Sequence, residues 1–65
     1  MLVARFAEEI RKELRTRMND IADTLAGGGA SSFEQYQGLC GEIRGLAIAE
    51  RALLDAAERM EKTDV

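Results

Sequence analysis

The chain contains no histidine and no proline, and it has a single cysteine among its 65 residues. Without histidine, the Ser–His and Cys–His pairs that activate a nucleophile cannot be assembled. A zinc site built from histidine and cysteine is excluded for the same reason. One cysteine cannot form a disulfide within the chain. We therefore expect a protein that is not an enzyme and that binds no metal or other cofactor.

The sequence also lacks a long apolar run and a basic stripe. Charged residues make up 32% of the chain, and no segment reaches the roughly 18–20 consecutive apolar residues that span a bilayer. The first segment, MLVARFAEEIRKEL, contains acidic residues and no cleavage-type site, so we expect no signal peptide. The net charge is −3, and Glu8, Glu9 and Glu13 lie among the basic residues of the first half at helical spacing. Nucleic acid is accordingly the weakest of the candidate partners.

The short length bears on stability. A chain of 65 residues forms one domain, residues 1–65, and buries little surface by itself. Small domains usually gain stability from disulfides, a metal or association. Because the first two routes are closed, we expect either self-association or docking into a larger assembly.

A glycine-rich segment, AGGGASS at residues 26–32, is the one clear break in the chain. Before it, apolar residues recur at steps of three and four, which predicts a helix over residues 2–26. Gly27 suits the left-handed position that often follows a helix end. The residues of this apolar stripe are Val3, Ala7, Ile10, Leu14, Met18, Ile21 and Leu25.

A second helix is predicted over residues 33–61, capped by Ser31 with Glu34 or by Ser32 with Gln35. Strand-like alternation is absent. The fold class is therefore all-α: an antiparallel αα-hairpin with its loop at residues 27–32. Its second apolar face comprises Tyr36, Leu39, Cys40, Ile43, Leu46, Ala47, Leu53, Leu54, Ala57 and Met60.

Folding the two helices back on each other predicts their alignment. Ile21 is expected near Tyr36, and Val3 near Leu54. We expect two such hairpins to pair as a twofold dimer that forms a four-helix bundle with coiled-coil-like packing.

The second predicted helix carries three glycines on one face, roughly opposite its apolar face. Each helical glycine costs roughly 0.5–1 kcal/mol relative to alanine. One interpretation is a second packing surface that allows close approach by another helix; the other is an exposed face that merely tolerates glycine. We favour the packing interface. Its candidate residues are Gly38, Gly41, Gly45, Ile48, Ala49, Ala52 and Ala56.

Glu50 falls inside the apolar face of the second helix. A buried carboxylate must be paired or neutralised, and Arg11 lies near the matching level of the first helix. These two residues are candidates for a core ion pair that specifies alignment or partner. The alternative places Glu50 at the rim, in contact with water. For Cys40, a buried and inert thiol is the expected state, since no basic neighbour activates it.

The second half reads SFEQYQGLCGEIRGLAIAERALLDAAERME. This pattern resembles short helical-hairpin proteins of tailed bacteriophages, often encoded near head and portal genes. The resemblance covers residues 33–61 well and the first helix only in pattern. The matching positions are Phe33, Tyr36, Leu39, Gly41, Ile43, Gly45, Leu46, Ala49 and Glu50.

The resemblance implies a phage origin more than an activity. We expect a virion structural or assembly accessory, located in the host cytoplasm or the virion, that binds itself or another phage or host protein. An alternative is a small regulator or inhibitor of a host protein. A weaker alternative is a nucleic-acid-binding hairpin dimer, similar in architecture to the plasmid RNA-regulating hairpins but without their basic stripe.

Overall fold

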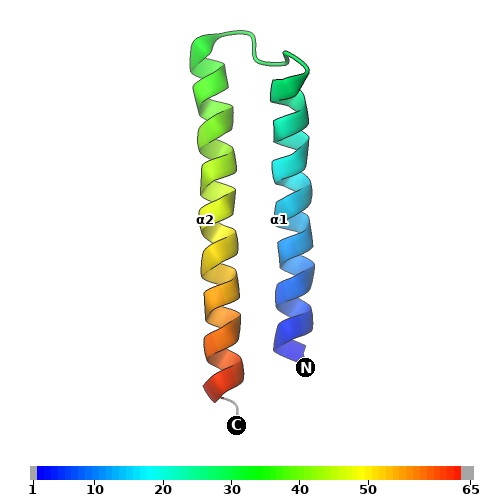
Figure 1. Cartoon of the computed structure of the whole chain (residues 1–65), viewed down its shortest axis with the longest axis vertical. Helices are drawn as coiled ribbons and strands as arrows, with labels where there is room; N and C mark the ends of the chain where they lie inside the picture. The colour runs from blue at the N-terminus through cyan, green and yellow to red at the C-terminus, as the bar shows by residue number, and fades with distance from the viewer. Residues whose placement is uncertain (1, 64–65) are drawn as a thin grey trace.

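The computed structural model describes residues 2–63 and contains two helices, α1 (Leu2–Ala26) and α2 (Phe33–Thr63). They lie side by side and antiparallel, joined by one short loop, with α2 extending past the start of α1 (Figure 1). The Cα trace measures 51 × 15 × 10 Å. The predicted all-helical hairpin is thus confirmed. The structure contains one hairpin, so the four-helix bundle stays a prediction.

The loop begins with a glycine C-cap on α1. Gly28 has a φ of 76°, in the left-handed region. Its N–H donates to the carbonyl of Leu25 (3.1 Å), and the N–H of Gly29 donates to that of Thr24 (2.7 Å). These two bonds define a Schellman motif, which satisfies the last carbonyls of the helix. The prediction that Gly27 takes the left-handed position was wrong by one residue, because Gly27 still donates a helical bond to Asp23 (2.9 Å).

The cap makes Gly28→Ala a test of this loop. A side chain in the left-handed region costs roughly 1–2 kcal/mol, and nothing else surrounds the site, since a Cβ there would meet no atom within 4 Å. We expect the free energy of unfolding in urea to fall by about 1 kcal/mol. Gly27→Ala is the comparison variant: its helical hydrogen bond remains and its φ is not positive, and its Cβ would lie 3.3 Å from the carbonyl oxygen of Asp23, the acceptor of that bond. A loss as large at Gly27 as at Gly28 would contradict this account.

Ser32 is the N-cap of α2, which settles the choice between the two predicted caps. Its hydroxyl accepts a hydrogen bond from the N–H of Gln35 (3.0 Å), and its carbonyl accepts the first helical bond from Tyr36 (3.0 Å). The Gln35 side chain reaches back one residue further than in the standard capping box and accepts bonds from the N–H (2.7 Å) and hydroxyl (2.6 Å) of Ser31. The far end of α2 runs to Thr63, two residues past the predicted end.

The hairpin has a thin core. Among the described residues, only Ala7 and Ile21 are buried apolar side chains. The other residues of the α1 apolar stripe are half-buried. A single pair of helices has one contact seam, so most apolar side chains retain an open side. The large hydrophobic residues left exposed are Leu2, Phe6, Phe33, Tyr36, Ile48, Leu54 and Met60.

The alignment of the helices differs from the prediction. Val3 lines a groove with Ala56 and Met60, whereas Leu54, its predicted neighbour, is exposed. The pairing of α1 is thus displaced toward the C-terminal end of α2. The physical reason lies in the polar contact that crosses the seam, described next.

Candidate interaction surfaces and a buried ion pair

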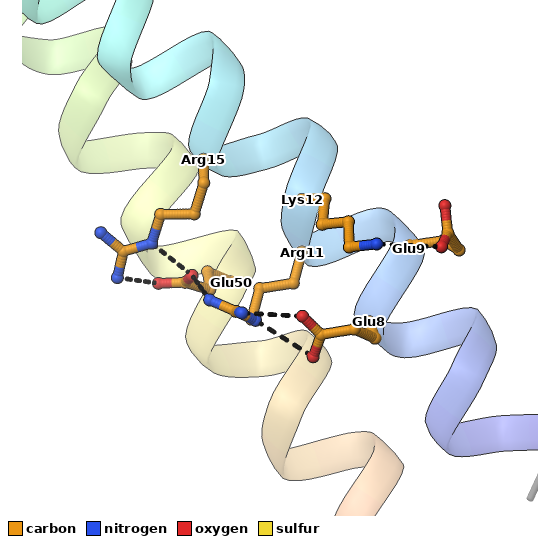
Figure 2. A network of polar contacts seen from close by, with 6 residues as sticks. All are labelled: Glu8, Glu9, Arg11, Lys12, Arg15 and Glu50. Atoms are coloured by element: carbon orange, nitrogen blue, oxygen red, sulfur yellow. Dashed lines mark hydrogen bonds and ion pairs between the residues drawn. The ribbon is translucent and has the colours of Figure 1, made fainter.

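Glu50 is the one buried charged residue among those described, with 8% of its surface exposed. Arg15 reaches it from α1: its Nε donates to Oε2 (2.7 Å) and its Nη2 donates to Oε1 (3.0 Å). Figure 2 shows the guanidinium and carboxylate facing each other across the seam. This is a bidentate pair, the geometry in which arginine binds a carboxylate most strongly. It satisfies both oxygens of a carboxylate that burial would otherwise destabilise.

Arg11 lies one turn before Arg15 and extends the pair into a network. Its Nη1 lies 3.9 Å from Oε2 of Glu50, while its Nη2 contacts Oε2 of Glu8 at 2.7 Å. The hydrogen bond from Arg11 lowers the pKa of the exposed Glu8 carboxyl below its usual value and raises the pKa of the Arg11 guanidinium. Two arginines of α1 thus approach one carboxylate of α2, and Glu8 holds the nearer end of the network through Arg11 (Figure 2).

The sequence identified the buried acid but not its main partner. Glu50 is buried and paired, so the interpretation that placed it at the rim was wrong. Arg11, the expected partner, makes the longer contact, and Arg15 makes the shorter one. A signal for Arg15 was available: it follows Arg11 by four residues, so both side chains share one side of α1.

Within the described part of the chain, one further ion pair joins the helices. Arg17 Nη2 lies 3.4 Å from Oε2 of Glu42, and both side chains are largely exposed. Pairs within a single helix, Lys12 with Glu9 (3.4 Å) and Arg51 with Asp55 (3.8 Å), are exposed as well. Exposed pairs contribute about 0–1 kcal/mol each. Only the Glu50 pair combines burial with bidentate geometry in residues 2–63.

The predicted glycine–alanine stripe lies on the open side of α2. Gly38, Gly41 and Gly45 are exposed, and a Cβ at any of them would meet nothing within 4 Å. Ile48, Ala49 and Ala52 are also exposed, whereas Ala56 is half-buried beside the groove at Val3. The three glycines therefore contact nothing within one hairpin, and Ala56 is the one residue of the stripe that the hairpin half-buries. Its role as an interface stays a prediction.

Cys40 is half-buried on the side of α2 that also carries Tyr36. The thiol raises the pKa of the Tyr36 phenol, first by hydrogen bonding and then by charge interaction. Tyr36 itself is exposed and stacks on Phe33, with 6.3 Å between the ring centroids. The expected burial of the thiol is thus only partial.

The site offers packing surfaces and charge pairs. Neither helix described by the structure is long and apolar enough to cross a membrane. Over residues 2–63 there is also no group of three acidic or cysteine side chains placed to hold a metal ion.

No family model, no curated protein and no solved structure matches the chain. The class of protein that the fold defines is an antiparallel helical hairpin with unpartnered apolar surface.

Proposed function

We propose that this chain is a non-enzymatic helical interaction protein that acts by self-association, most simply as a twofold dimer with a four-helix bundle. The observation that carries the proposal is the thin core. Two buried apolar residues and seven large exposed ones among residues 2–63 are a poor balance for a domain that must be stable alone. Since the chain has no disulfide and no histidine for a zinc site, association is the remaining source of buried apolar surface.

The exposed area supports the same proposal. The hairpin exposes 5099 Å², whereas a compact monomer of its mass is expected to expose roughly 4,100 Å². The difference, about 1,000 Å², is similar to the roughly 800 Å² that each partner buries in a standard protein interface. One more hairpin packed on one face would bring the exposed area per chain back to the ordinary value.

The test is the mass of the protein as a function of concentration. Sedimentation equilibrium from nanomolar to micromolar protein is expected to show twice the chain mass of 7.2 kDa at the upper end. Because the core is thin, circular dichroism is expected to show helicity falling as the dimer dissociates. A fully helical 7.2-kDa monomer at micromolar concentration would rule out self-association as the basis of function.

We further propose that the biological setting is a tailed bacteriophage, where the protein serves as a virion component or an assembly accessory. The support is the pattern shared with phage helical hairpins, whose matching positions include Gly41, Gly45 and Glu50. Glycine inside a helix and a buried acid are both unfavourable without a structural reason. Mass spectrometry of purified virions tests this: recovery of the chain in particles supports it. Its absence from particles and from assembly intermediates, together with capture of one host protein, would favour the regulator instead.

A further inference from the structure

We propose that the second copy docks on one defined side of the hairpin, with Phe6 of each copy packed against Ala56 of the other. The proposal rests on the self-association proposed above and adds its geometry. We call the surface the Phe6 face: it comprises Phe6 and Ile10 of α1 with Ala49, Leu53, Ala56 and Met60 of α2. Phe6 and Met60 are both exposed in the single hairpin, Phe6 by 64%.

The ion pair between Arg17 and Glu42 shows that these residues share one side of the hairpin. Both side chains must project to the same side of the seam to meet at 3.4 Å. Phe6 precedes Arg17 by eleven residues, about three helical turns, so it projects in nearly the same direction. Met60 follows Glu42 by eighteen residues, about five turns, and is aligned with it in the same way. The Phe6 face therefore includes surface from both helices.

The opposite side of the hairpin is less suited to a dry interface. There Arg11 and Arg15 extend from α1 over the seam to Glu50, and Glu8 adds a fourth charge. The Arg15 side chain remains about half exposed, so a second hairpin on that side would have to desolvate it. Removing such charges from water without new partners is unfavourable. On the side of the Phe6 face the Arg17–Glu42 pair lies nearer the loop, and the far half carries Val3, Ala56 and Met60, with Arg59 and Thr63 completing the lining of their groove.

The Phe6 face is also complementary to itself. A twofold axis parallel to the helices places α1 of one copy over α2 of the other at the same level, with neighbouring helices antiparallel. Val3, one turn before Phe6, already lines a groove with Ala56 and Met60. Helical side chains lean toward the N-terminus, so the Phe6 ring of one copy is directed to the level of that groove on the other. A large aromatic side chain then meets a small one on each side of the axis.

This arrangement divides the predicted glycine–alanine stripe. Ala49 and Ala56 follow Glu42 by seven and fourteen residues, close to two and four turns, so they lie on the Phe6 face and allow the partner's α1 to approach. Gly41 and Ile48 project away from it, on the outer side of α2. Of these two sets, the structure half-buries only Ala56, at the edge of the groove.

Disulfide trapping between two variants tests the geometry. In a Cys40→Ser background, one preparation carries Phe6→Cys and the other Ala56→Cys; the two are mixed, equilibrated under reducing conditions and then oxidised. We expect the mixed disulfide to exceed clearly the half of products that random pairing gives, because the two positions adjoin only between copies. Mixing Phe6→Cys with Ile48→Cys is the control and should give no such excess. Mass spectrometry of the non-reduced dimers measures the proportions.

A second pair of variants tests the same interface without replacing Phe6, because Phe6→Cys removes the side chain that is proposed to form the contact. Ile10→Cys with Ala49→Cys keeps Phe6 intact and samples the next contact along the same face. Enrichment of the mixed product in either pair supports the proposal. Random or like-with-like products in both pairs, from a wild-type chain that sediments as a dimer, would overturn the Phe6 face and leave self-association standing. A monomeric wild-type chain would overturn both.

Discussion

Replacing Arg15 with methionine is expected to lower the free energy of unfolding by about 2 kcal/mol, although most of the Arg15 side chain lies near the surface. The substitution keeps the length of the side chain and removes both hydrogen bonds to Glu50. The carboxylate then stays buried with Arg11, 3.9 Å away, as its nearest cation. Breaking a fully buried pair costs roughly 3–5 kcal/mol; the partial exposure of Arg15 and the nearby Arg11 reduce the expected loss.

Arg17→Met is the matched control, because it removes the other ion pair between the helices. Arg17 and Glu42 are largely exposed and meet at 3.4 Å, so we expect a loss of about 0.5 kcal/mol or less. Urea unfolding at a fixed protein concentration measures both variants. Equal losses for Arg15→Met and Arg17→Met would show that burial of the Glu50 carboxylate has no energetic weight.

The double variant Arg15→Met with Glu50→Leu completes the comparison. Removing both charges leaves no buried carboxylate to satisfy, and apolar replacements of buried ion pairs are often neutral or stabilising. We expect most of the stability lost in Arg15→Met to return. With the single variant Glu50→Leu measured as well, the interaction energy of the cycle separates the contribution of the ion pair from the packing of the two side chains.

Phe6→Glu is expected to raise the dissociation constant of the dimer by roughly two to four orders of magnitude. Burying a phenylalanine side chain contributes roughly 1.5–3 kcal/mol. A twofold interface contains the contact twice, so each substitution counts twice in the dimer. Sedimentation equilibrium of the variant at several loading concentrations measures the change.

Ile48→Glu is the control for Phe6→Glu, since both residues are 64% exposed in the single hairpin. Ile48 lies on the outer side of α2, and we expect the dissociation constant to change by less than about threefold, because surface substitutions usually act within about 0.5 kcal/mol. The reverse result, dissociation by Ile48→Glu and tolerance of Phe6→Glu, would identify the glycine–alanine stripe itself as the dimer interface.

The helices were predictable from sequence because their signals are local. The apolar steps from Val3 to Leu25 and the three glycines after Ala26 placed α1 correctly, and serine with Gln35 placed the start of α2. The left-handed residue of the cap was predicted one position too early, because each of three consecutive glycines can adopt a positive φ. The φ of 76° and the two hydrogen bonds, from Gly28 to Leu25 and from Gly29 to Thr24, assign the left-handed position to Gly28.

The alignment of the helices and the partner of Glu50 depend on long-range geometry. An arginine side chain spans more than one helical turn, so Arg11 and Arg15 can both reach one carboxylate. The positions of the two arginines along α1 therefore do not predict which of them binds Glu50. The structure identifies Arg15 as the main partner, because its Nε lies 2.7 Å from Oε2 of Glu50, whereas Nη1 of Arg11 lies 3.9 Å from the same oxygen. For the glycine–alanine stripe, the contact that would establish an interface is one with a helix of another chain, which a single hairpin does not contain.

The bidentate contact of Glu50 also reduces the number of competing states. Apolar side chains at steps of three and four present similar surfaces at every turn, so two such helices could slide by one turn, about 5.4 Å, and still bury comparable area. A slip that brings Asn19 to the place of Arg15 loses both directed bonds to Glu50, whereas the opposite slip brings Arg11 into that place. The pair therefore disfavours one of the two neighbouring alignments, and this difference contributes to the energy gap that a smooth folding landscape requires.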